Sequence, residues 1–107
     1  NDMLRRINPE QTEKNLEKII KIIQNKKINI LLAGMVALPS NGLRYKKKFD
    51  EIFPNLAKKY ELPLIPFLLD KVALKPELNL SDGMHPNEKG ILVISKTVKK
   101  SIIHLIK

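Results

Sequence analysis

Hydrophobic residues recur along this chain in three helical stripes, separated by two nearly continuous apolar runs. The first stripe has the i, i+3, i+4, i+7 spacing of an amphipathic helix and consists of Leu16, Ile19, Ile20 and Ile23. Asn8 is expected to cap this helix, with Pro9 at its first position and Gln11 three residues after the cap. The pattern therefore predicts a helix that starts at Asn8, with Pro9 as its first helical position.

The second and third stripes predict two further helices. The second consists of Tyr45, Phe49, Ile52, Phe53, Leu56 and Tyr60. Pro54 interrupts it, and we expect this residue to bend the helix or to mark a new first turn. The third helix should begin soon after Pro86, and its apolar positions are Ile91, Ile94, Val98, Ile102 and Leu105.

The two apolar runs predict strands. Residues 28–36 suit a strand buried on both faces of a parallel sheet. Residues 62–69 form the second strand, in which Pro63 and Pro66 indicate an edge or irregular position. Strands that alternate with helices predict an α/β fold with a mostly parallel sheet. Two strands are too few for such a sheet, because each would carry unpaired backbone groups on a side meant to be buried.

The charge is strongly positive, at +9 with an isoelectric point of about 9.9. A basic module that binds nucleic acid or anionic lipid is one interpretation. The lysines, however, recur at helical spacing between apolar positions, as at Lys14, Lys18 and Lys21, without interleaved aromatic residues. This distribution favours solvated helix faces. The chain contains no cysteine, which excludes disulfides and cysteine metal sites, and no stretch reaches the ~20 apolar residues of a membrane span.

Candidate chemistry is concentrated in the segment Ser-Asp-Gly-Met-His-Pro-Asn at 81–87. It places the carboxylate of Asp82 three residues before the imidazole of His85. A neutral histidine is the usual general base for a hydroxyl nucleophile, and a nearby aspartate can fix its tautomer. On these residues alone, the alternative to a catalytic role is that His85 is a loop residue that forms hydrogen bonds with the backbone before the last helix. A metal site from Asp82, His85 and His104 is disfavoured, since most of the last helix separates the two histidines.

The order of several segments is informative. Asn1-Asp2 is followed by Leu-Pro-Ser-Asn-Gly at 38–42, Leu-Pro-Leu-Ile-Pro-Phe at 62–67 and Asp-Gly-Met-His-Pro-Asn at 82–87. This order resembles the C-terminal part of SGNH (GDSL-type) hydrolases, in the arylesterase, acyl-CoA thioesterase and lysophospholipase branch, over essentially all 107 residues. The family's N-terminal part, with its Gly-Asp-Ser nucleophile block and oxyanion glycine, is absent.

The resemblance implies a fold and a set of roles. Residues 1–107 would be the C-terminal part of a single SGNH hydrolase domain, a flavodoxin-like three-layer α/β/α sandwich with a parallel sheet. His85 would be the general base and Asp82 would orient it, while the Asn1 amide would donate into the oxyanion hole. Asp2 would have a structural, hydrogen-bonding role. Apolar contacts to the acyl group would come from Met3, Leu4, Val36 and Leu38.

These roles predict a serine-dependent carboxyl-ester or thioester hydrolase that needs no metal or organic cofactor. Its partners would be an acyl ester or thioester and the missing N-terminal segment. The serines of this chain, Ser40, Ser81, Ser95 and Ser101, do not follow a strand in a Gly-Asp-Ser context, so we expect the chain alone to be inactive. The competing interpretations are a non-catalytic remnant and the basic binding module. Neither compartment (periplasmic, secreted or cytoplasmic) nor acyl-chain length follows from these features.

Overall fold

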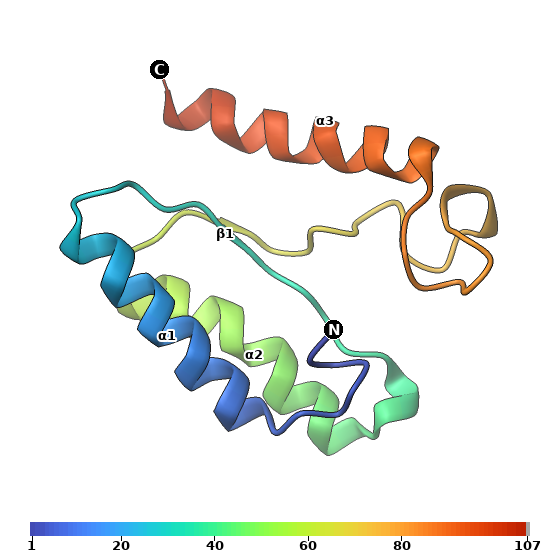
Figure 1. Cartoon of the computed structure of the whole chain (residues 1–107), viewed down its shortest axis with the longest axis horizontal. Coiled ribbons are helices and arrows are strands. Elements are labelled where there is room, and N and C mark those ends of the chain that lie inside the picture. The colour runs from blue at the N-terminus through green and yellow to red at the C-terminus, as the bar shows by residue number, and fades with distance from the viewer. Residues whose placement is uncertain (107) are drawn as a thin grey trace. The chain divides into compact units, whose positions relative to one another are not determined.

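A computed structural model of the chain describes residues 1–106 (Figure 1). It divides into two compact units, residues 1–66 and residues 67–107. The first unit contains α1 (Pro9–Asn25), β1 (Leu32–Ala33), η1 (Pro39–Asn41), α2 (Leu43–Lys59) and β2 (Leu64–Ile65). The second contains η2 (Pro76–Leu78) and α3 (Glu88–Leu105). Among residues 1–106, no helix is both long and apolar enough to cross a membrane.

The strands of the first unit are parallel, as predicted, with Leu32 opposite Leu64 and Ala33 opposite Ile65. Both are much shorter than the runs 28–36 and 62–69, so the predicted strand lengths are wrong. Pro63 and Pro66 flank β2 and lack the amide hydrogen that a longer ladder would use. Ile28 is 56% exposed, which also contradicts a strand buried throughout its length.

Gly34 allows the two backbones to approach each other directly after β1. Its amide donates to the Ile65 carbonyl at 2.7 Å. A Cβ atom added at Gly34 would lie 2.5 Å from the carbonyl oxygen of Pro66, a distance that such contacts do not tolerate. Only glycine fits this position without moving the strands apart.

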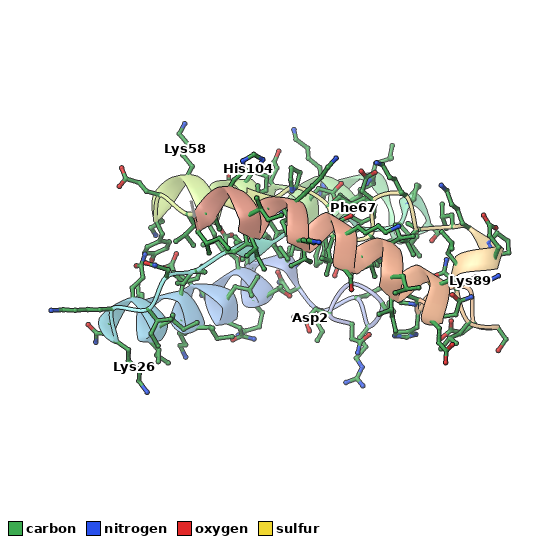
Figure 2. All side chains as sticks on the ribbon, turned by 90° about the horizontal axis from the view of Figure 1, so that it is seen from above. Asp2, Lys26, Lys58, Phe67, Lys89 and His104 are labelled. Atoms are coloured by element: carbon green, nitrogen blue, oxygen red, sulfur yellow. The ribbon has the colours of Figure 1, made fainter. Side chains whose placement is uncertain are left out.

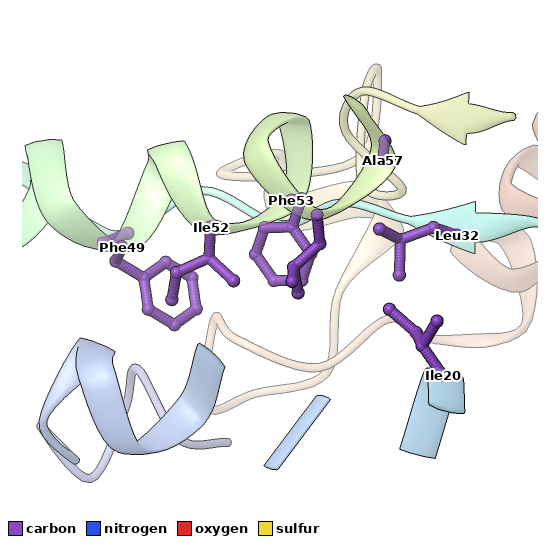
Figure 3. Close-up of a cluster of buried hydrophobic side chains, with 8 residues drawn as sticks. Ile20, Leu32, Phe49, Ile52, Phe53 and Ala57 are labelled. Atoms are coloured by element: carbon purple, nitrogen blue, oxygen red, sulfur yellow. The ribbon is translucent and has the colours of Figure 1, made fainter. Parts of the chain in front are cut away.

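The core of the first unit lies between the helices and β1, and α1 and α2 run beside each other on one face of the strand pair (Figures 1 and 3). Its buried residues are Ile20, Leu32, Ala37, Phe49, Ile52, Phe53, Leu56 and Ala57. Half of them belong to the predicted stripe of α2, and Tyr45 and Tyr60 of the same stripe pack against the core, so the stripe is confirmed. The rings of Phe49 and Phe53 meet edge to face, with centroids 5.7 Å apart.

The start of α1 is confirmed. The Asn8 side chain accepts from the Glu10 amide at 2.9 Å, and Pro9 occupies the first helical position. The Gln11 side chain donates to Asn15 at 2.9 Å. In α2 the helix continues through Pro54, so a new first turn at that residue is ruled out.

The third helix begins at Glu88, two residues after Pro86, as expected. Its apolar stripe is only partly covered: Ile91, Ile102 and Leu105 are 55%, 41% and 52% exposed, whereas Ile94 and Val98 are half-buried. Helical periodicity correctly places these residues on one element. It does not supply the surface needed to bury them.

Leucines at the two ends of α2 provide a matched test of this core. Leu56→Ala should destabilise the chain by about 2–5 kcal/mol, because Leu56 is 1% exposed and its loss leaves a cavity. Leu43 is 80% exposed, and Leu43→Ala should change the free energy of unfolding by less than about 0.5 kcal/mol. Urea unfolding followed by circular dichroism measures both. Equal losses would contradict the assigned core.

Candidate active site

Asp82 and His85, here called the Asp82–His85 pair, lie side by side in the second unit. The Nδ1 atom of His85 is 2.7 Å from Oδ2 of Asp82. The other carboxylate oxygen accepts the backbone amides of Met84 at 2.8 Å and His85 at 3.0 Å. These bonds favour the charged carboxylate and lower the pKa of Asp82 from 3.8 to about 2, with the His85 side chain as the largest cause.

This arrangement determines which ring nitrogen carries the proton. A carboxylate only accepts hydrogen bonds, so Nδ1 of His85 donates to Asp82, and in the neutral ring Nε2 is then the atom that can take up a proton. The side chains of His85 and Asp82 are 52% and 47% exposed. The half-exposed imidazole of His85 can therefore accept a proton from a nucleophile placed beside its Nε2 atom.

The loop that carries the pair is closed by backbone hydrogen bonds. The Leu80 amide donates to the His85 carbonyl at 2.7 Å, and the Gly83 amide donates to Leu80 at 2.9 Å. Gly83 has φ +71°, a left-handed conformation that glycine adopts without strain. At the base of the loop, Asn79 and Pro86 form an antiparallel bridge. The two residues of the pair are therefore held on one short closed loop.

The base of the loop is also fixed to the start of α3. The Asn87 side chain accepts from the Gly90 amide at 3.0 Å, and its amide nitrogen donates to the carbonyls of Glu77 and Asn79 at 3.0 and 3.2 Å. Gly90 is buried, and a Cβ there would lie 2.2 Å from the Leu78 carbonyl oxygen. Sequence reasoning missed Gly90, although a glycine three residues after a capping asparagine is a usable signal.

Asn1 lies in the first unit, at the start of a turn that packs near α1. Its side chain is exposed, and its carbonyl accepts the Arg5 amide at 3.0 Å. Asp2 makes the structural hydrogen bonds that we expected. Its carboxylate accepts the hydroxyl of the buried Thr12 at 2.8 Å, and its carbonyl accepts the Ile7 amide at 2.9 Å. The Asn1-Asp2 segment is therefore attached to α1.

Two of the segments expected to contact an acyl group are joined to each other. The Asn41 side chain donates to the Met3 carbonyl at 3.0 Å, and the Asn41 amide donates to Leu38 at 3.0 Å. Met3 is half-buried and packs against the core, whereas Leu4 is 38% exposed. Of these two residues, Leu4 has more apolar surface available to a ligand.

The segment from Val36 to Leu38 is attached to α2 through its middle residue. The amide of Ala37 donates to Oδ1 of Asp50 at 2.7 Å, and its carbonyl accepts from Nζ of Lys46 at 3.0 Å. Lys46 and Asp50 are themselves paired at 2.6 Å. One ion pair thus satisfies both backbone groups of the buried Ala37 and leaves Val36 and Leu38 half-buried on either side.

The remaining polar candidates are distributed over other elements and the loop of the pair. Ser40 is in η1, Ser95 and Ser101 are in α3, and Ser81 belongs to the loop itself. Within residues 1–106 there is no cluster of three or more side chains suited to a metal ion. His104 is exposed on α3.

The lysines of the first unit include both solvated and paired side chains. Lys26, at the end of α1, and Lys58, on α2, point away from each other (Figure 2). Lys59 pairs with Glu17 at 3.0 Å, which links α2 to α1. Solvated, partly paired helix faces account for these lysines better than a continuous anion-binding surface does.

Comparison with known proteins assigns the family. Residues 1–91 match the GDSL-like Lipase/Acylhydrolase family. The chain belongs to this family. It is 37% identical over 107 residues to the thioesterase 1/protease 1/lysophospholipase L1 of Escherichia coli strain K12, covering 99% of this chain and 51% of that protein. It is 33% identical over 103 residues to an arylesterase of Vibrio mimicus, covering 96% and 52%.

Solved structures confirm the α/β fold class. The psychrotrophic esterase EstA from a Pseudoalteromonas species matches with a TM-score of 0.90 at 27% identity, covering 99% of this chain and 58% of that one. An esterase of the SGNH-hydrolase family matches with a TM-score of 0.74 at 37% identity, covering 100% and 57%. The chain spans about half the length of the curated relatives it matches.

The lowered pKa of Asp82 leads to a pH prediction. Because folding lowers this pKa, the carboxylate stabilises the native loop fully above pH 3.8, and that contribution is lost as the pH falls through about 2. The carboxyl carbon of Asp82, followed by NMR and assigned with Asp82→Asn, should titrate near 2. In His85→Ala the midpoint should rise toward 3.8. A midpoint near 3.8 in the unmutated chain would contradict the hydrogen-bonded loop.

Proposed function

We propose that this chain is the C-terminal part of a serine-dependent carboxyl-ester or thioester hydrolase. The observation that carries the proposal is the 2.7 Å contact between His85 and Asp82, on a closed loop, in a chain of the GDSL-like family. The nucleophilic serine would come from a segment that precedes Asn1. The substrate class is that of the relatives, which are named as thioesterase, lysophospholipase and arylesterase.

The proposed reaction assigns one task to each group. The serine hydroxyl attacks the acyl carbonyl while Nε2 of His85 takes its proton. Asp82, charged at neutral pH, stabilises the resulting imidazolium and keeps Nδ1 protonated. The Asn1 side-chain amide donates to the oxyanion. His85 then returns the proton to the leaving oxygen or sulfur, and water completes the cycle by hydrolysing the acyl-enzyme.

Acyl selectivity would come from the first unit. The segments that the family resemblance assigns to acyl contact present Leu4, which is exposed, and Val36 and Leu38, which are half-buried. Met3 packs against the core of this unit. In the second unit, a pocket of about 360 Å³ is lined by Ser81 and Gly83 of the loop and by apolar residues that include Leu74 and Leu80. This pocket adjoins the loop that carries the pair and would offer further apolar contact.

The first test asks whether the chain suffices by itself. Since none of its serines has a nucleophile context, the purified 107-residue chain should not hydrolyse a short-chain aryl ester above the rate of His85→Ala. It should also not be labelled covalently by a phosphonate, the class of inhibitor bound in one EstA structure. Turnover or labelling that His85→Ala abolishes would show that a serine of this chain is the nucleophile.

The second test uses the intact protein, in which the chain is joined to its nucleophile segment. His85→Ala should lower kcat at least about 10⁴-fold, and adding Asp82→Asn should cost little more, because groups that act as one unit are not additive. Asn1→Ala should lower kcat on the order of 10²-fold with little change in KM, since its bond would form mainly in the transition state. Steady-state kinetics on a neutral aryl ester measures all of these effects.

Two outcomes of the second test would contradict the assignment. One is near-normal kcat in His85→Ala. The other is losses from His85→Ala and Asp82→Asn that simply multiply. Asn87 is unsuitable as a control because it caps α3, whereas Asn55→Ala, on the exposed side of α2, should leave kcat and KM unchanged.

A further inference from the structure

Asn79 is a buried amide without an assigned role. It is 8% exposed, and its side-chain nitrogen donates to the carbonyls of Val72 at 2.9 Å and Lys75 at 2.8 Å. An amide nitrogen has two hydrogens, so both are used. Val72 is fully buried, which makes it a fixed point for the segment that Asn79 contacts.

The segment held by this amide is strained. Lys71 and Leu74 adopt left-handed backbone conformations, with φ of +68° and +64°, which are unfavourable for residues other than glycine. The two carbonyls that accept from Asn79 belong to Val72 and Lys75, each of which directly follows one of the strained residues. The two hydrogen bonds from the Asn79 amide therefore stabilise a backbone conformation that is unfavourable by itself.

The backbone of Asn79 faces the loop of the pair. Its carbonyl accepts from the Asn87 side chain at 3.2 Å, and it forms the bridge to Pro86. The next residue, Leu80, donates to the His85 carbonyl at 2.7 Å. A single residue thus connects the strained segment through its side chain to the base of the loop through its main chain.

The Asp82–His85 pair depends on such a support. Both side chains are about half exposed, and a hydrogen bond between two such side chains contributes too little energy to fix its own geometry. The orientation of the two side chains must therefore come from the backbone that carries them. Asn79 lies where that backbone enters the closed loop.

We propose that Asn79 is a positioning residue for the Asp82–His85 pair, acting through the base of the loop; its effect on catalysis rests on the hydrolase function proposed above. Without the amide donors, the strained segment relaxes and the start of the loop moves. The carboxylate and the imidazole then lose their alignment. A misplacement of about 1 Å is enough to cost on the order of 10²-fold in rate.

Asn79→Asp is the sharpest test, because it keeps the shape but replaces the two donors by a group that repels the facing carbonyls. Asn79→Ala removes the donors without adding charge. In both variants of the full chain, the NMR titration midpoint of Asp82 should rise from about 2 toward 3.8. In the intact protein, kcat should fall roughly 10- to 100-fold with KM nearly unchanged. Asn55→Asp, the same replacement on the exposed side of α2, should change neither quantity.

The NMR readout separates this proposal from the hydrolase function, because it does not require turnover. Folded Asn79 variants whose Asp82 midpoint stays near 2 would overturn the positioning role, even if the intact protein is an esterase. An intact protein without esterase activity but with a shifted midpoint would overturn the function and keep the positioning role.

A measurement on the unmutated chain covers the case in which the variants do not fold. The side-chain amide protons of Asn79 should exchange with solvent as slowly as the Leu80 backbone amide, because both belong to one closed structure. Exchange of the Asn79 amide at the rate of an exposed asparagine, with Leu80 still protected, would show that the loop closes without it.

Discussion

The contact between Asp82 and His85 joins two side chains that are about half exposed to water. Because water competes for this contact, the backbone of the second unit has to hold the two side chains in place. A hydrogen bond between two half-exposed side chains gains little net free energy once side-chain entropy and competition with water are counted. The pair at 2.7 Å is therefore a result of backbone geometry. The hydrogen bond between Leu80 and His85 closes the loop, and the amides of Met84 and His85 fix the carboxylate.

In the first unit, too, hydrogen bonds from side chains hold the backbone of loops in place. The segment around Ala37 does not extend β1, and the ion pair of Lys46 and Asp50 satisfies its backbone. The turn at the N-terminal end is bonded to η1 through Asn41 and to the start of α2 through Tyr45, whose hydroxyl donates to the Ile7 carbonyl at 2.7 Å. In both units, side chains from a helix or turn form hydrogen bonds with the backbone of loops that carry candidate functional residues. These bonds take the place of those that a neighbouring strand would make. The backbone polar groups of these loops are thereby paired without a sheet ladder.

Elements with a periodic signal could be predicted from the sequence. The stripe of α2, the Asn8 cap of α1 and the parallel strand pair all follow from residue spacing and local chemistry. The pairing of Asp82 with His85 is also local, since three residues separate them. The predictions of strand length and of helix burial failed, because both depend on what packs or pairs against the element. The strands are short because prolines flank β2, and much of the α3 stripe remains exposed.

The backbone contacts of Asn79 and of the Lys46–Asp50 pair were not predictable for a related reason. Each bonds to backbone carbonyls or amides several residues away, and carbonyl positions leave no trace in a residue pattern. A buried asparagine looks like any other loop asparagine in the sequence. The exposed Asn55 and the buried Asn79 differ only in what the fold places around them.

The division of the chain into two units has a chemical consequence for the proposed hydrolase. The residues proposed for proton transfer, Asp82 and His85, belong to the second unit, whereas the proposed oxyanion donor Asn1 belongs to the first. Hydrogen bonds within the second unit hold Asp82, and hydrogen bonds within the first unit hold the segment that contains Asn1. The proposed reaction would need both together with a nucleophile, because the serine proton would pass to His85 while negative charge develops on the acyl oxygen that Asn1 would bind. In an open parallel sheet, functional residues gather at the carboxyl ends of the strands, so a further strand that ends there would supply the proposed serine.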